Sequence, residues 1–113
     1  MIRGLLLTAL AASTAWARIP DATANQYADA IYRAEGGARA KVPYGILSVP
    51  VRDAAEARRV CLRTIQRTHD RWLKAGQPGY FVHYLADRYC PPAADPIGNA
   101  NWKKNVVTFL RRS

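Results

Sequence analysis

The chain has 113 residues, with 17 lysines and arginines against eight aspartates and glutamates, so its formal net charge is +9. This length accommodates one domain and excludes a two-domain enzyme or a dinucleotide-binding α/β fold. The excess of positive charge favours anionic partners, and an apolar content of 50% excludes a disordered basic tail.

The N-terminal segment has the three parts of a secretory signal peptide. Arg3 is followed by a short apolar run over residues 4–12 and by an Ala-Trp-Ala cleavage triplet at residues 15–17. The run is shorter than the ~20 residues that span a bilayer. We therefore expect residues 1–17 to be removed and residues 18–113 to form one exported domain, periplasmic or extracellular. The alternative is that the segment is an N-terminal core helix.

Cys61 and Cys90 are the two cysteines of the chain. Export permits a disulfide, and two cysteines allow a single pairing. Closing a loop of this length contributes about 3–4 kcal/mol in chain-entropy terms. We expect a Cys61–Cys90 disulfide, with two buried free thiols as the alternative. Two cysteines and two distant histidines do not make a zinc site, so we expect no metal and no cofactor.

The first half of the exported chain predicts one helix and one irregular segment. Asp21 or Thr23 can cap the helix, which stops at the glycine pair of residues 36–37. Residues 42–51 contain two prolines and several β-branched side chains. We interpret this segment as a loop with a short strand or hairpin arm.

Three further helices follow. Asp53 and Glu56 form a capping-box pattern that starts a long helix ending near Ala75. A third helix covers residues 80–89, and Asn101 can cap a fourth. The predicted fold class is mainly α, a small domain of about four helices with an irregular or short β segment after the first helix.

Glu35 is the acidic residue with the strongest case for a chemical role. It ends the first predicted helix, where the helix dipole disfavours a carboxylate, and its neighbours are tyrosines and an isoleucine. Both features raise the pKa of a carboxyl group, as a general acid near neutral pH requires. The glycines that follow allow a ligand or another backbone segment to approach closely. The alternative is an ordinary exposed glutamate near a helix end.

Two strings around Glu35 carry a family resemblance: IYRAEGG at residues 31–37 and PYGILSV at residues 43–49. They resemble the catalytic core of the lysozyme-like superfamily, and more narrowly its lytic transglycosylases. Glu35 matches the glutamate at a helix end in that family. Residues 45–48 are similar to a Gly-Leu-Met-Gln segment that lines the cleft, with Ser48 in place of Gln. Residues 85–89 loosely resemble the family's Ala-Tyr-Asn segment, with Cys90 in place of Asn.

The resemblance implies a lysozyme-like fold and cleavage of the β-1,4 bond between N-acetylmuramic acid and N-acetylglucosamine in peptidoglycan. Glu35 would be the catalytic acid and base. Tyr44, Gly45, Ser48 and Tyr89 become substrate-binding candidates, the tyrosines by stacking on sugar rings or by orienting the acid. The alternatives are that the tyrosines are core aromatics and that Ser48 is an ordinary loop serine.

A second catalytic carboxylate, which glycoside hydrolysis by the usual routes requires, is not evident. Asp53 is the nearest candidate downstream of Glu35, but its capping pattern explains it better, and Asp95 is a weaker candidate. The resemblance implies a transglycosylase, in which the 6-hydroxyl of the sugar replaces water and one acid/base suffices. The alternatives are a two-carboxylate muramidase, or a non-catalytic basic protein for wall binding or assembly on the same scaffold.

Four arginines lie at every fourth position of the long predicted helix: Arg59, Arg63, Arg67 and Arg71. Each step turns about 40° around the helix axis, so the four side chains form one slanted basic stripe. A solvated face is the simple interpretation. The specific interpretation is a surface for an anionic polymer, which in an exported protein means cell-wall peptide carboxylates, teichoic acid or lipopolysaccharide before nucleic acid.

Overall fold

The computed structural model describes residues 18–46 and 50–113. The predicted signal peptide and Ser48 lie outside the described residues. The described part contains four α-helices and two short 3-10 helices, with these bounds: α2 Asp21–Ala34, η1 Gly37–Arg39, η2 Pro43–Gly45, α3 Ala54–Lys74, α4 Phe81–Tyr89 and α5 Pro96–Arg111. The fold is mainly α, as predicted. The described residues contain no β-strand, and two 3-10 turns follow the first helix instead.

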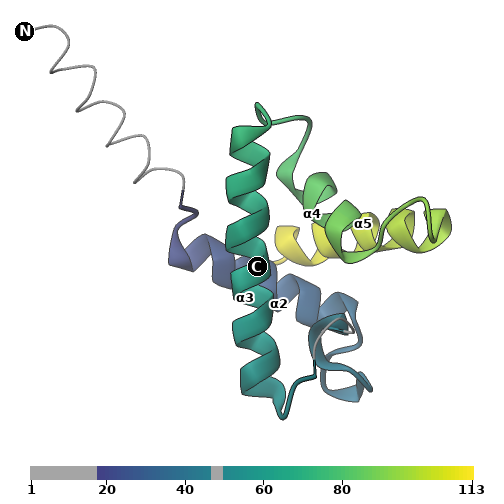
Figure 1. Cartoon of the computed structure of the whole chain (residues 1–113). Helices are drawn as coiled ribbons and strands as arrows, with labels where there is room; N and C mark the ends of the chain where they lie inside the picture. The colour runs from purple at the N-terminus through teal and green to yellow at the C-terminus, as the bar shows by residue number, and fades with distance from the viewer. Residues whose placement is uncertain (1–17, 47–49) are drawn as a thin grey trace, which may run out of the picture.

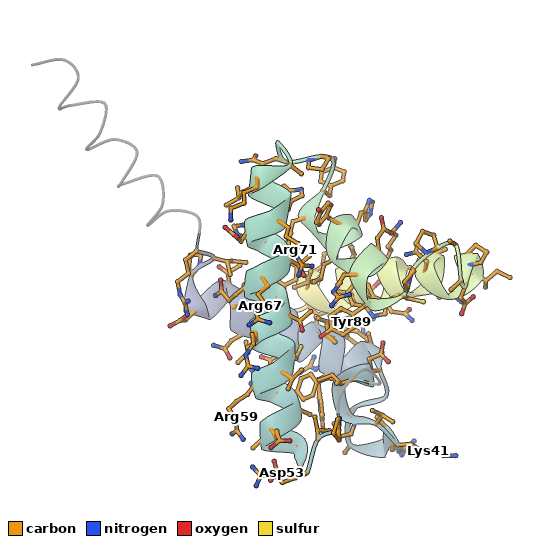
Figure 2. The ribbon with its side chains drawn as sticks, viewed as in Figure 1. Lys41, Asp53, Arg59, Arg67, Arg71 and Tyr89 are labelled. Carbon is orange, nitrogen blue, oxygen red and sulfur yellow. The ribbon has the colours of Figure 1, made fainter. Side chains whose placement is uncertain are left out.

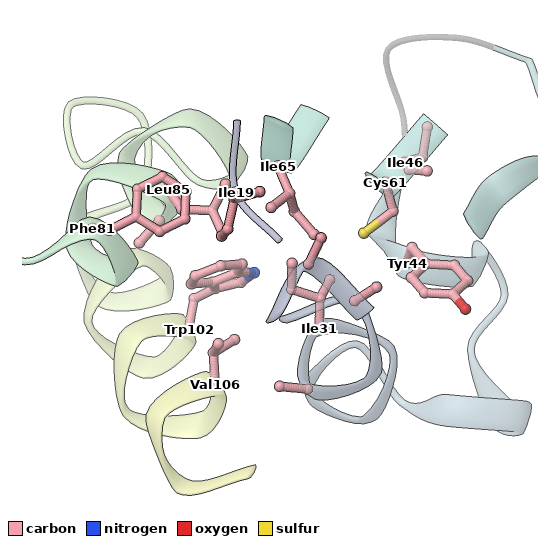
Figure 3. Packing of buried hydrophobic residues seen from close by; sticks show 14 of the residues in the cluster. Ile19, Ile31, Tyr44, Ile46, Cys61, Ile65, Phe81, Leu85, Trp102 and Val106 are labelled. Carbon is pink, nitrogen blue, oxygen red and sulfur yellow. The ribbon is translucent and has the colours of Figure 1, made fainter. Parts of the chain in front are cut away.

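The four helices pack in pairs around one core. α2 contacts both α3 and α5, and α4 contacts both α3 and α5, so each helix packs against two others (Figure 1). The largest fully buried apolar side chains come from all four helices: Ile31, Ile65, Leu85 and Val106 (Figure 3). None of the described helices is both long enough and apolar enough to cross a membrane.

The predicted cap of α2 was wrong, whereas its stop was confirmed. Pro20 is the N-cap, and its carbonyl oxygen accepts the first helical hydrogen bond from the Ala24 N–H at 2.9 Å. Asp21 lies within the first turn, where its negative charge suits the helix dipole. The helix ends at Ala34, and Gly36 adopts a left-handed φ of 109° that interrupts it.

The start of α3 confirms the predicted cap. An Asp53 carboxylate oxygen accepts a hydrogen bond from the Glu56 N–H at 2.8 Å. The Glu56 carboxylate accepts from Arg52 rather than from Asp53, at 3.1 Å from the backbone N and 2.9 Å from Nε. Ala75 is the C-cap, as the sequence indicated.

The predicted start of α5 was wrong. Asp95 is the N-cap, with its carboxylate 2.9 Å from the Gly98 N–H, and Pro96 occupies the first turn. An Asp-Pro pair is a strong start signal because aspartate accepts from free helical N–H groups and proline needs no acceptor. Asn99 is therefore helical and buried, and its amide donates to Asp87 and to the Cys90 carbonyl.

We predict that Asp95→Ala lowers the free energy of unfolding by about 1 kcal/mol, because the first turn of α5 loses its side-chain acceptor. Asn101→Ala is the matched control, since Asn101 is exposed inside the helix and does not cap it. Urea titration followed by circular dichroism measures both. A larger loss for Asn101→Ala than for Asp95→Ala would contradict the observed helix start.

Candidate active site around Glu35

Glu35 lies at the C-terminal end of α2, as its C-cap residue. Its backbone N–H still donates to the Ile31 carbonyl at 2.9 Å, so the last helical turn fixes the position of the side chain. Burial raises the pKa of the Glu35 carboxyl group, and the indole N–H of Trp102 lowers it to a smaller extent. The carboxyl group thus retains its proton to a higher pH than an exposed glutamate does.

Gly45 is the residue against which the Glu35 carboxylate packs. A methyl group at Gly45 would overlap the Glu35 side chain, and the φ of Gly45 is +63°. Both facts favour glycine at this position. The preceding residue, Tyr44, also has a positive φ, 59°. Two consecutive left-handed residues turn the chain back onto the helix end and bring backbone, rather than a side chain, to the acid.

Tyr44 is packed in the core. It is 5% exposed, and its ring lies 5.1 Å from the Tyr32 ring, measured between centroids. Its hydroxyl oxygen accepts a hydrogen bond from Arg58 at 3.0 Å. Arg58, on α3, also donates to Asp29 at 2.9 Å and to Asn25 at 2.7 Å, both on α2. Tyr44 therefore anchors the turn that carries Gly45. It is a core aromatic residue, which was the alternative to a sugar-stacking role.

Tyr89 reaches the same region from the end of α4. Its ring stacks on Trp102 with centroids 5.3 Å apart and planes 24° apart. Its hydroxyl donates to the Cys61 sulfur at 3.1 Å. Burial is the main cause that raises the pKa values of Tyr89 and Cys61, and the nearby Glu35 charge raises both further. The pKa of Cys61 is raised to about 11. Cys61 is thus a protonated thiol at neutral pH and a poor nucleophile.

The two cysteines are free thiols in this structure. The Cys61 sulfur faces the Tyr89 hydroxyl from inside the core, and Cys90 is a half-buried residue at the end of α4. Oxidation in the exported protein stays a prediction, which alkylation and mass measurement without reductant would test.

Trp102, on the buried face of α5, is a site residue that no sequence motif singles out. Its indole Nε1 is buried and has no partner at full hydrogen-bond geometry among the described residues. The group on which this N–H acts is the Glu35 carboxylate, whose pKa it lowers. A correct start for α5 would have placed Asn99, Trp102 and Val106 on one buried face.

Burial and Trp102 are the causes that shift the pKa of Glu35, and no other acid of the described residues is among them. Asp53 caps α3 and Asp95 caps α5, so both side chains already have structural partners. In the parts of the chain that the structure describes, no three metal-ligating side chains cluster. The arrangement can therefore supply one proton donor, which becomes a base after donation.

Gly45→Ala should unfold more easily than the wild type and displace the Glu35 carboxylate. Gly79→Ala is the matched control, because Gly79 has a similar φ of +69° with no atom within 4 Å of the added methyl group. The backbone strain common to both is about 1–2 kcal/mol. Thermal unfolding should show an additional loss for Gly45→Ala. Equal losses would mean that Glu35 does not pack against this residue.

Glu35→Gln should raise the melting temperature at neutral pH. Because burial raises the folded-state pKa above the ordinary value of about 4.3, the native state loses stability as pH rises through the folded pKa. The glutamine variant avoids that loss, so its advantage should vanish below about pH 4. Melting scans from pH 3 to 8 test this.

The control for this comparison is Asp21→Asn, at the favourable end of the same helix dipole. Removing that charge should not stabilise the protein at neutral pH. A stability gain of Glu35→Gln that persists unchanged at pH 3 would show that the carboxyl pKa is not raised.

Comparison with known proteins identifies no relative of this chain. No family model, no curated protein and no solved structure matches the chain. The chemistry of the site is accordingly derived from its own parts, which are a half-buried carboxyl group of raised pKa, the Gly45 backbone against it and the Trp102 N–H beside it.

Proposed function

We propose that this protein is an exported, lysozyme-like enzyme of the lytic transglycosylase type. It cleaves the β-1,4 bond between N-acetylmuramic acid and N-acetylglucosamine in peptidoglycan. The observation that carries the proposal is the Glu35 carboxyl group, held at a helix end against Gly45 with a pKa raised by burial. The resemblance of residues 31–37 and 43–49 to that family supports the choice of substrate.

Glu35 acts first as an acid and then as a base. Its proton passes to the glycosidic oxygen as the bond between that oxygen and the anomeric carbon breaks. The resulting carboxylate takes the proton of the muramic 6-hydroxyl, whose oxygen bonds to the same anomeric carbon and gives a 1,6-anhydro sugar. The Trp102 N–H favours the ionised state of Glu35 during the second half of the cycle.

The engagement of the other candidate carboxylates in helix caps supports this route over hydrolysis. A retaining or inverting glycosidase uses two carboxyl groups on either side of the scissile bond. Asp53 and Asp95 are engaged in helix caps, and each accepts a backbone N–H within 3 Å. A reaction in which the substrate supplies its own nucleophile needs no further acid.

One observation favours a second candidate, a non-catalytic wall-binding or assembly protein. Tyr44 is buried, and Tyr89 uses a face of its ring against Trp102, so both predicted sugar-stacking tyrosines are engaged within the protein. Ser48, the other predicted substrate contact, lies outside the described residues. A non-catalytic protein on this scaffold would bind the wall through a surface other than these tyrosine rings.

Digestion of purified sacculi separates the candidates. The wild type should release 1,6-anhydro-muramyl products, which are one water lighter than reducing ends and so are resolved by mass. Glu35→Gln preserves shape, but its amide has no acidic proton to transfer. General-acid catalysis typically contributes ~10²–10⁴-fold, so product formation should fall by that range. Asp53→Asn is the control and should retain both the rate and nearly all of the stability, because asparagine caps a helix about as well as aspartate.

Other outcomes point elsewhere. Reducing ends that disappear in both Glu35→Gln and Asp53→Asn would identify a two-carboxylate muramidase. Retained sacculus binding without soluble products from the wild type would identify the non-catalytic protein. Anhydro products whose yield is unaffected by Glu35→Gln would remove Glu35 from the reaction.

A further inference from the structure

The arginine stripe of α3, defined as Arg59, Arg63, Arg67 and Arg71, is exposed along its whole length. Figure 2 shows three of its members, Arg59, Arg67 and Arg71, along the helix. The acidic residues of the same helix are engaged with other cations. Glu56 pairs with Arg52 and Asp70 pairs with Lys74, both at 2.9 Å. No ion pair within the described residues involves an arginine of the stripe. Four guanidinium groups thus face solvent without intramolecular neutralisation.

The spacing of the stripe suits a linear chain of negative charges. Successive arginines are about 6 Å apart along the helix axis, and the four span about 18 Å while turning about 120° around it. A flat surface meets only part of such a curved row, because a planar partner cannot follow the turn. A flexible polymer can cross α3 obliquely and contact each arginine in succession.

A lipid surface fits this helix poorly for a second reason. An interfacial helix inserts an apolar face into the bilayer, but the apolar face of α3 is already in the core through Ala57, Cys61 and Ile65. The exposed large hydrophobic residues of the described chain are Tyr80 and Ile97, neither of which is on α3. The exposed face of α3 therefore offers a partner positive charge without an adjacent apolar patch.

The chemistry of the stripe favours phosphate. All four positions carry arginine, whose planar guanidinium donates two parallel hydrogen bonds to one phosphate, whereas lysine acts as a point charge. Arg63 also borders an open surface groove of about 450 Å³ between α3 and the start of α2. Arg18 and Asp21 also line this groove and pair with each other at 3.5 Å, so Arg63 supplies its unpaired guanidinium group.

We propose that the arginine stripe binds a linear phosphodiester polymer of the cell envelope, of the teichoic acid type, laid obliquely across α3. The assignment to the envelope rests on the proposed exported function, whereas the pairing of guanidinium with phosphate rests on the stripe itself. Binding there would hold the protein on the wall independently of the chemistry at Glu35.

The test titrates the purified protein with lipid-free polyglycerol phosphate and follows binding calorimetrically at several salt concentrations. Arg63→Gln/Arg67→Gln removes the middle of the stripe and should weaken binding roughly tenfold or more. The slope of log K against log salt should become shallower by about 0.7 for each phosphate that the variant no longer neutralises. Arg111→Gln/Arg112→Gln is the matched control, with the same change in charge at the exposed end of α5, and should bind nearly as well as the wild type.

Folding does not confound this comparison, because removing like charges four residues apart relieves repulsion in α3 and should not lower the melting temperature. Equal losses of affinity in the two double variants would show a general charge effect and overturn the proposal. Equal or tighter binding of polyglutamate, of phosphatidylglycerol vesicles or of single-stranded DNA would overturn it as well. Glu35→Gln should bind the polymer like the wild type, so failure of the catalytic proposal is seen separately in the sacculus digest.

Discussion

One guanidinium group, that of Arg58, holds together the three segments that form the site. From α3 it donates to Asn25 and Asp29 on α2 and to the Tyr44 hydroxyl in η2, all within 3.0 Å. Charge-assisted hydrogen bonds of this kind are short and directional. Tyr44 is next to Gly45, so the same group determines where the Gly45 backbone meets Glu35. Without this interaction, η2 has no polar connection to α3 among the hydrogen bonds of the described chain.

The site concentrates features that do not favour stability. Tyr44 adopts a left-handed backbone conformation, the Glu35 carboxyl group is partly removed from water, and the buried Trp102 N–H lacks an ideal partner. Each costs free energy, and such strained or unsatisfied groups tend to cluster at functional sites. Similar features occur elsewhere, since Gln77 has a φ of 57° and the buried Thr68 Oγ1 and Trp72 Nε1 have no hydrogen-bond partner among the described residues. The end of α2 is distinguished by the partly buried carboxyl group of Glu35.

The sequence predicts features that depend on neighbouring residues and does not predict contacts between separate helices. The stop of α2 at the glycine pair, the Asp53 cap and the position of Glu35 at a helix end each depend on a few neighbouring residues. The Asp95 cap is also local, because the Asp-Pro pair at residues 95–96 is a stronger helix-start signal than Asn101. The contact of Trp102 with Glu35 and the packing of Tyr44 and Tyr89 arise only when separate helices meet. No local pattern encodes whether a tyrosine ring faces solvent or its own core.

The helix start at Asp95 limits where residues can be inserted into or deleted from this chain. Trp102 follows Asp95 by seven residues, all within α5, and Asn99 between them ties the helix to the end of α4. One residue added or removed between Pro96 and Trp102 would rotate the indole about 100° away from Glu35. The turn over residues 91–94 can absorb the same change at its surface. Related sequences that share this site should therefore keep the spacing Asp-Pro-x5-Trp and differ in length just before it.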